Sequence, residues 1–88
     1  MIARVATHES LPALEGEGPN RFRAWMKEQP GFVAAWHFRD GATGRGVSVS
    51  LWQDRASLEA IKSKTPPGGA VGMKPPLSVE LFDDVTPF

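Results

Sequence analysis

Cysteine and tyrosine are both absent from this chain of 88 residues. The absence of cysteine excludes disulfide bonds, thiolate metal sites and a cysteine nucleophile. Charge of one sign is not in excess either, because ten basic residues balance ten acidic ones. Binding to nucleic acid relies on a surplus of basic residues that releases counterions. We therefore expect no nucleic-acid partner.

Long hydrophobic runs are missing as well. No apolar stretch approaches the length needed to span a membrane, so we expect no membrane association. The first residues lack a basic flank followed by an apolar core, which argues against a secretory signal and makes the cytoplasm the default location. The acidic pairs Glu15/Glu17 and Asp83/Asp84 have no histidine or third carboxylate at ligand spacing, so we expect no metal ion. No motif indicates another cofactor.

What is present fits one small globular domain over residues 1–88. The hydrophobic fraction is 41%, which is ordinary for a folded protein. A chain of this length buries only a modest share of its surface, and association with a second copy is a common way to enlarge the core.

Residues 2–8 are short and largely non-helical in period, which predicts an opening strand. Alternation of the two faces predicts further strands at residues 32–39, 46–52 and 77–82. A helix is predicted over residues 19–28, where Phe22, Trp25 and Met26 form one apolar stripe. A second helix should start after the N-cap residue Asp54 and carry Leu58 and Ile61. Residues 64–76 are rich in proline and glycine and predict an irregular loop.

The predicted order is strand, helix, strand, strand, helix, strand. This is the split pattern of the ferredoxin-like α+β fold. Right-handed crossovers place both helices on one face of a four-stranded antiparallel sheet.

The pattern also predicts which residues share each face of that sheet. We expect the helices to cover the more apolar face, formed by Val5, Ala34, Trp36, Phe38, Val47, Val49, Leu51, Leu77, Val79 and Leu81. The opposite face then holds a mixed set, Ile2, Arg4, Val33, Ala35, His37, Ser48, Ser50, Trp52 and Phe82. Its large apolar members favour burial by a second sheet, which predicts a homodimer. The alternative is a monomer with a few exposed hydrophobic residues.

Two short segments resemble a known family. Gln29-Pro30-Gly31-Phe32 follows the first predicted helix, and Trp52-Gln53-Asp54 leads into a helix that contains Ser57-Leu58-Glu59-Ala60. These segments, with the order of elements, resemble the antibiotic biosynthesis monooxygenase-like family of the dimeric α+β barrel superfamily. The resemblance implies a ferredoxin-like dimer. The family includes cofactor-independent monooxygenases that act on aromatic polyketides, and heme-degrading enzymes.

The heme-degrading members use an asparagine in the first strand, a tryptophan inside the second helix and a histidine that follows it. Here the first strand has no asparagine, Ile61 stands near the position of the tryptophan, and no histidine follows. Heme degradation is therefore not expected. The quinone-forming members surround their substrate with tyrosine, asparagine and tryptophan. This chain has no tyrosine, and its single asparagine, Asn20, lies at a helix start.

The candidate catalytic residues are His37, Arg39 and His8. His37 and Arg39 are two positions apart and share one face of their strand, with Arg4 a possible neighbour on the first strand. A histidine beside guanidinium groups can bind an anion or act as an acid or base. It can equally be an interface histidine that forms hydrogen bonds across two sheets. His8, at the end of the first strand, is either at a pocket mouth or an exposed surface residue.

A ligand pocket is predicted where the first helix meets the sheet. Aromatic side chains and small neighbours should leave an apolar space for a flat hydrophobic ligand, bordered by Trp25, Trp36, Phe38, Leu58 and Ile61. The same residues can instead be plain core. The loop over residues 64–76 is long enough to act as a lid on this space.

Two functions remain open at this point. The first is a cofactor-independent oxygenase that acts on a hydrophobic aromatic compound. The second is a non-catalytic dimer that binds a small hydrophobic molecule or serves as an accessory protein. The sequence does not name the ligand.

Overall fold

The computed structural model of the chain describes residues 1–64 and 75–88. Within these residues six elements follow one another: β1 (Ile2–His8), α1 (Glu17–Lys27), β2 (Phe32–Arg39), β3 (Gly46–Trp52), α2 (Arg55–Ile61) and β4 (Ser78–Phe82). The predicted order and type of every element are confirmed. Most of the loop predicted as a lid lies outside the described residues.

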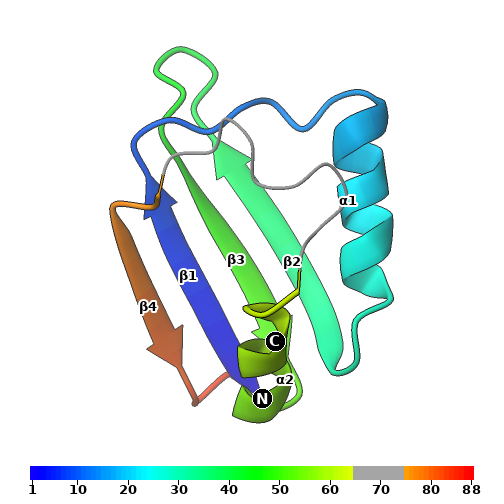
Figure 1. Cartoon of the computed structure of the whole chain (residues 1–88). Coiled ribbons are helices and arrows are strands. Elements are labelled where there is room, and N and C mark those ends of the chain that lie inside the picture. The colour runs from blue at the N-terminus through cyan, green and yellow to red at the C-terminus, as the bar shows by residue number, and fades with distance from the viewer. Residues whose placement is uncertain (65–74) are drawn as a thin grey trace.

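The four strands form one antiparallel sheet in the order β2-β3-β1-β4. Both helices lie on the same side of this sheet, with α1 alongside β2 and α2 near the end of β3 (Figure 1). This arrangement confirms the α+β, ferredoxin-like fold class.

The segment between α1 and β2 turns sharply at Gly31, where φ is +80°. A side chain at this position would collide with the side chain of Ser57 at the start of α2. The carbonyl of Gly31 also accepts a hydrogen bond of 2.8 Å from the backbone N–H of Gln53. Glycine is therefore required here because the turn and α2 approach each other closely.

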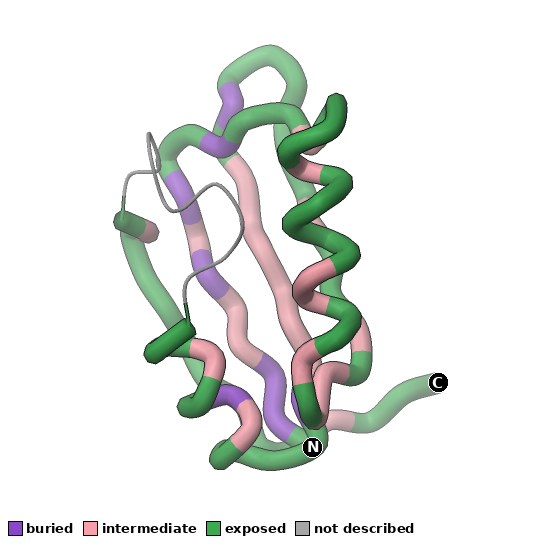
Figure 2. Tube along the Cα trace, turned by 45° about the vertical axis from the view of Figure 1, so that its right-hand side comes forward, coloured by how far each residue is buried: buried purple, intermediate pink, exposed green. Residues whose placement is uncertain are grey.

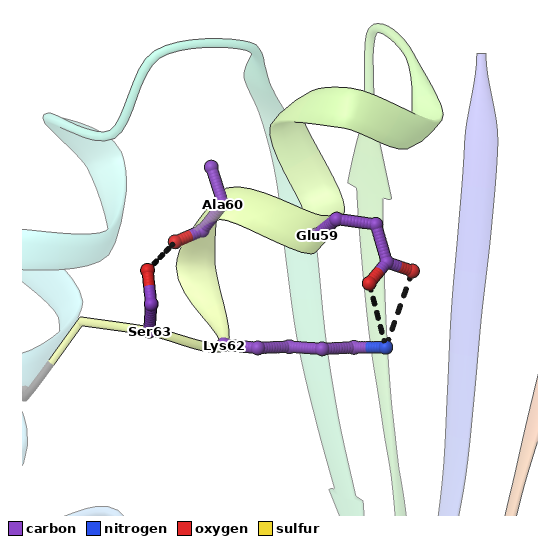
Figure 3. Close-up of polar contacts among 4 residues, drawn as sticks. All are labelled: Glu59, Ala60, Lys62 and Ser63. Atoms are coloured by element: carbon purple, nitrogen blue, oxygen red, sulfur yellow. Dashed lines mark hydrogen bonds and ion pairs between the residues drawn. The ribbon is translucent and has the colours of Figure 1, made fainter.

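The short helix α2 is stabilised at both ends by local polar contacts. At its start, the carboxylate of Asp54 accepts a hydrogen bond of 2.8 Å from the backbone N–H of Ser57, as predicted for an N-cap. At its end, the hydroxyl of Ser63 donates to the carbonyl of Ala60 at 3.0 Å, and Lys62 pairs with Glu59 at 3.1 Å (Figure 3). These contacts satisfy groups that a seven-residue helix cannot pair by itself.

The hydrophobic core sits at one end of the sheet. Ile2, Trp52 and Leu58 are almost fully buried, and residues of both helices and the start of β2 pack against them. The rings of Phe32 and Trp52 meet edge to face, with centroids 5.6 Å apart. The indole N–H of Trp52 donates to the hydroxyl of Ser50 at 3.0 Å, so this buried polar group is satisfied.

The predicted assignment of the two sheet faces is wrong for β1, β2 and β3. Trp52 pairs with Ile2 in the register, and both are buried beneath the helices, on the face that we expected to be open. Trp36 pairs with Val49, and Phe38 with Val47, on the opposite face. Trp36 is 50% exposed and Phe38 56% exposed. The helices therefore cover the more polar face, and the apolar face lies open in this chain.

Strand β4 is the exception, because Val79 was expected on the helix side and Phe82 on the opposite face, and both lie there. Val79 lies opposite Ala6, and Phe82 lies opposite Ala3. Directly opposed residues of an antiparallel pair point to the same side. Val79 therefore belongs to the helix side, whereas Phe82 belongs to the open apolar face together with Trp36 and Phe38.

Candidate functional site

A cavity of about 840 Å³ lies between α1 and the sheet. Its walls come from α1 and the segment before it, from β2, from the middle of β3 and from β1, with the lining residues Arg4, Leu14, Phe22, Arg23, Met26, Lys27, Phe32–His37, Arg39 and Ser48–Ser50. These segments are far apart in the sequence, and Figure 2 shows α1 in front of the sheet.

The cavity exists because α1 does not pack closely onto the sheet. No residue of α1 is fully buried, although Trp25 and Met26 are partly so. The sheet floor below it carries small side chains, including Ala35, Ser48 and Ser50. Around Trp52 the space between helices and sheet is filled, with Met26 and Phe32 packed against the buried core. The result is a filled core at one end and an open space at the other.

His37 borders the cavity in the middle of β2, directly opposite Ser48 of β3. Its Nε2 atom is shielded from solvent and has no hydrogen-bond partner among the described residues. Burial lowers the pKa of His37 below 6.5, and the nearby Arg39 and Arg23 lower it further, while the backbone carbonyl of Pro12 acts in the opposite direction. The imidazole is therefore mostly neutral at pH 7 and can accept a proton.

His8 is a buried residue, only 8% exposed. The prediction of an exposed surface histidine is therefore wrong, because β1 is a central strand of the sheet. Its Nε2 atom lies 3.3 Å from the hydroxyl oxygen of Ser48. Burial lowers its pKa, and the positive charge of Arg4 adds to this effect. His8 is not itself a lining residue, but it contacts the cavity wall through Ser48.

Arg39 and Arg4 both border the cavity on the same face as His37, as the strand pattern predicted. They lie at different points along the sheet, because Arg39 is opposite Gly46 and Arg4 is opposite Ser50. Arg39 is fixed in position, because its Nε donates a hydrogen bond of 2.7 Å to the carbonyl of Leu11. Arg23 of α1 reaches the same region and donates to the carbonyl of Leu14 at 3.1 Å.

The five residues predicted to border a ligand are largely placed elsewhere. Trp36 borders the cavity, but its pairing with Val49 points its side chain to the open face, so its main chain forms the wall. Phe38 lies on the open face. Leu58 and Ile61 belong to the core around Trp52. The binding role of these five residues stays a prediction, whereas the observed cavity has a different lining.

Other lining residues were missed by the sequence pattern. Arg23 and Lys27 are four positions apart on α1, as are Phe22 and Met26, so each pair shares a side of the helix. The apolar pair was assigned to the apolar stripe of the predicted helix, and the basic pair was given no role. The signal in the sequence is the spacing of four positions, which places each pair on one side of the helix. It identifies these residues only once that side is known to lie over a polar sheet floor.

Two further observations on the described residues concern metal ligands and membrane-spanning helices. Across residues 1–64 and 75–88, no group of three or more histidine, aspartate or glutamate side chains is placed to hold a metal ion. In the same part of the chain, neither helix has the length and apolar character needed to cross a membrane.

Comparison with known proteins gives a structural match. No family model matches the sequence, and no curated protein matches it either. The fold is similar to the heme-free crystal structure of a heme-degrading protein from Mycobacterium tuberculosis, with a TM-score of 0.56 and 20% sequence identity. The match covers 99% of this chain and 96% of that protein. At this identity the similarity establishes a shared fold over the whole chain.

Proposed function

We propose that this protein is a member of the antibiotic biosynthesis monooxygenase-like family that binds a hydrophobic aromatic compound in the cavity under α1 and oxidises it without a cofactor. The observation that carries the proposal is the cavity itself. Its volume of about 840 Å³ falls in the range of about 300–1,000 Å³ typical of small-molecule sites. It combines apolar walls from Phe22, Met26 and Phe32 with a few polar groups on the sheet floor.

The proposed reaction uses the substrate as the source of electrons. A base removes a proton from an activated ring CH₂ group, which leaves an electron-rich carbanion. The carbanion reduces molecular oxygen, and the overall change converts CH₂ and O₂ into C=O and H₂O. His37 is the proposed base, because it is neutral at pH 7 and borders the cavity. The neighbouring guanidinium groups would stabilise the anion that forms.

The proposal includes a homodimer formed through the open apolar face of the sheet. Trp36, Phe38 and Phe82 are each about half exposed on that face, and Val47 and Val49 lie between the strands that carry them. An apolar surface of this kind is unusual on a monomer. A second copy can cover it by packing sheet against sheet, which buries the apolar faces of both copies at once.

The test uses 1,8-dihydroxyanthrone as substrate and 1,8-dihydroxyanthraquinone as a stable ligand. We expect oxygen uptake above the uncatalysed rate and saturable binding in calorimetry. Ala35→Phe should reduce both by at least about tenfold, because Ala35 lines the sheet floor of the cavity. Ala24→Phe is the matched control, since Ala24 is exposed on α1 and is not a lining residue.

Three results are informative. Loss of binding in Ala35→Phe but not in Ala24→Phe supports the site. Saturable binding without oxygen uptake would replace the oxygenase with the alternative, a non-catalytic dimer that binds small molecules. Binding that is insensitive to Ala35→Phe, or no binding at all, would contradict the proposed site.

A further inference from the structure

The wall of the cavity has an excess of positive charge. Arg4, Arg23, Lys27 and Arg39 line it, and no carboxylate does so among the residues that the structure describes. The chain as a whole has equal numbers of acidic and basic residues, so this excess is a local arrangement. Neither of the two ion pairs found in the described residues, Arg21–Glu17 and Lys62–Glu59, involves a lining residue.

The arginines differ in how many of their donors are already used. Arg23 is occupied by the protein, because its two terminal nitrogens donate to the carbonyl of Leu14 and to the side chain of Asn20. Arg39 uses only Nε, in its bond to Leu11, which fixes the guanidinium and leaves both terminal nitrogens free. Arg4 makes no side-chain hydrogen bond or ion pair with any described residue.

Arg4 also occupies a special place in the sheet. It lies on central strand β1, half-buried, directly opposite Ser50 of β3. Ser50 accepts a hydrogen bond from Trp52, so its own hydroxyl hydrogen remains available to a ligand. A half-buried guanidinium without a counterion is unfavourable, and the other cations in the cavity wall add to this cost. A bound anion would remove this cost.

We infer that Arg4, with Ser50 opposite it in the register, forms an anion-binding point in the cavity, and that the ligand is therefore a flat aromatic compound that carries a carboxylate. Arg39 does not belong to this point, because it lies opposite Gly46, four positions along β3 from Ser50. This inference rests on the proposed function for the binding of the ring. The planar guanidinium group matches a carboxylate through two parallel hydrogen bonds, a geometry that an ammonium group or a hydroxyl cannot reproduce. The apolar walls bind the ring, and Arg4 selects its acid group.

The test compares anthraquinone-2-carboxylate with its neutral carboxamide by calorimetry at low salt. The two probes share the same ring, so the difference between them isolates the charge. We expect the native protein to bind the carboxylate at least about tenfold more tightly. Arg4→Gln should weaken the binding of the carboxylate to the level of the amide. Arg4→Lys should keep only part of the preference for the carboxylate, because the bidentate geometry is lost.

Arg45→Gln is the charge-matched control, because Arg45 is exposed in the hairpin between β2 and β3 and does not line the cavity. It should keep the full preference for the carboxylate. Circular dichroism of each variant checks the fold, and Arg4→Lys gives the test if Arg4→Gln does not fold.

The outcomes separate the two proposals. Equal binding of acid and amide by the native protein would overturn the anion site but leave the aromatic site standing. A full preference for the acid in Arg4→Gln, or in Arg4→Lys if Arg4→Gln does not fold, would also overturn it. Failure of both probes to bind would instead contradict the proposed function itself.

Discussion

The Nε2 atom of His8 and the hydroxyl oxygen of Ser48 lie 3.3 Å apart, which links a buried histidine of β1 to the floor of the cavity. Ser48 is in turn the register partner of His37. The two histidines therefore flank one serine across three adjacent strands. Their environment makes this the part of the chain most sensitive to pH near neutrality.

We predict that the free energy of unfolding decreases as the pH falls below about 6.5. The pKa values of His8 and His37 are both lowered by burial and by nearby positive charge. The unfolded chain therefore binds protons at a higher pH than the folded chain does. It follows that the stability is complete above the ordinary value of 6.5 and is lost progressively below it.

Thermal unfolding at about pH 7.5 and about pH 5.5 checks this prediction. We expect the Tm to fall by a few degrees, since 1 kcal/mol corresponds to about 4–8 °C for a domain of this size. The double variant His8→Gln/His37→Gln should show a clearly smaller change over the same interval. An equal change in the variant would assign the pH dependence to other groups.

We predict that Arg4→Gln stabilises the ligand-free protein while it weakens the binding of acidic ligands. The change removes a half-buried charge that faces other cations and has no partner in the described part of the chain. Sites built for binding often reduce stability in this way. The expected rise in Tm is about 2–5 °C at low salt, and it should shrink at high salt because charge repulsion is screened. A lower Tm in Arg4→Gln would show that Arg4 stabilises the fold.

We predict that Phe38→Glu shifts the protein from dimer to monomer. Phe38 is 56% exposed on the apolar face of a single chain, and a carboxylate there would be buried without a partner in a sheet-to-sheet interface. Light scattering at micromolar concentration should give twice 9.6 kDa for the native protein and close to the single-chain mass for the variant. Phe88→Glu is the control, because Phe88 is fully exposed at the C-terminus. A native mass near 9.6 kDa would contradict the dimer.

We predict that hemin causes no sharp Soret shift at one equivalent, even though the fold is shared with a heme-degrading protein. Helix α2 carries no histidine, and of the two histidines in the chain only His37 borders the cavity. Absorption titration of the native protein and of His37→Ala measures this. A stoichiometric shift that disappears in His37→Ala would establish heme binding at His37 and would require a different function.

Much of the architecture could be predicted from the sequence because it depends on local chemistry. The alternation in residues 32–39 and 46–52 set the strands, and the Asp54 cap set the start of α2, as found. The candidate site was predicted only in part. His37 and Arg39 were identified because a strand places alternate residues on one face, whereas Trp25, Phe38, Leu58 and Ile61 were placed around a cavity that they do not line.

The sequence by itself determined the order, type and approximate limits of the elements, since hydrophobic period, caps and turn residues act over a few positions. Only the tertiary structure decided which face of the sheet the helices cover. An alternating strand defines two faces, but it does not specify which of them the helices pack against. Here Trp52 anchors both helices on the more polar face, and this choice gathers Arg4, His37 and Arg39 around one cavity while Trp36 and Phe38 stay open. Contacts between distant segments decide such a choice, and no local pattern records them.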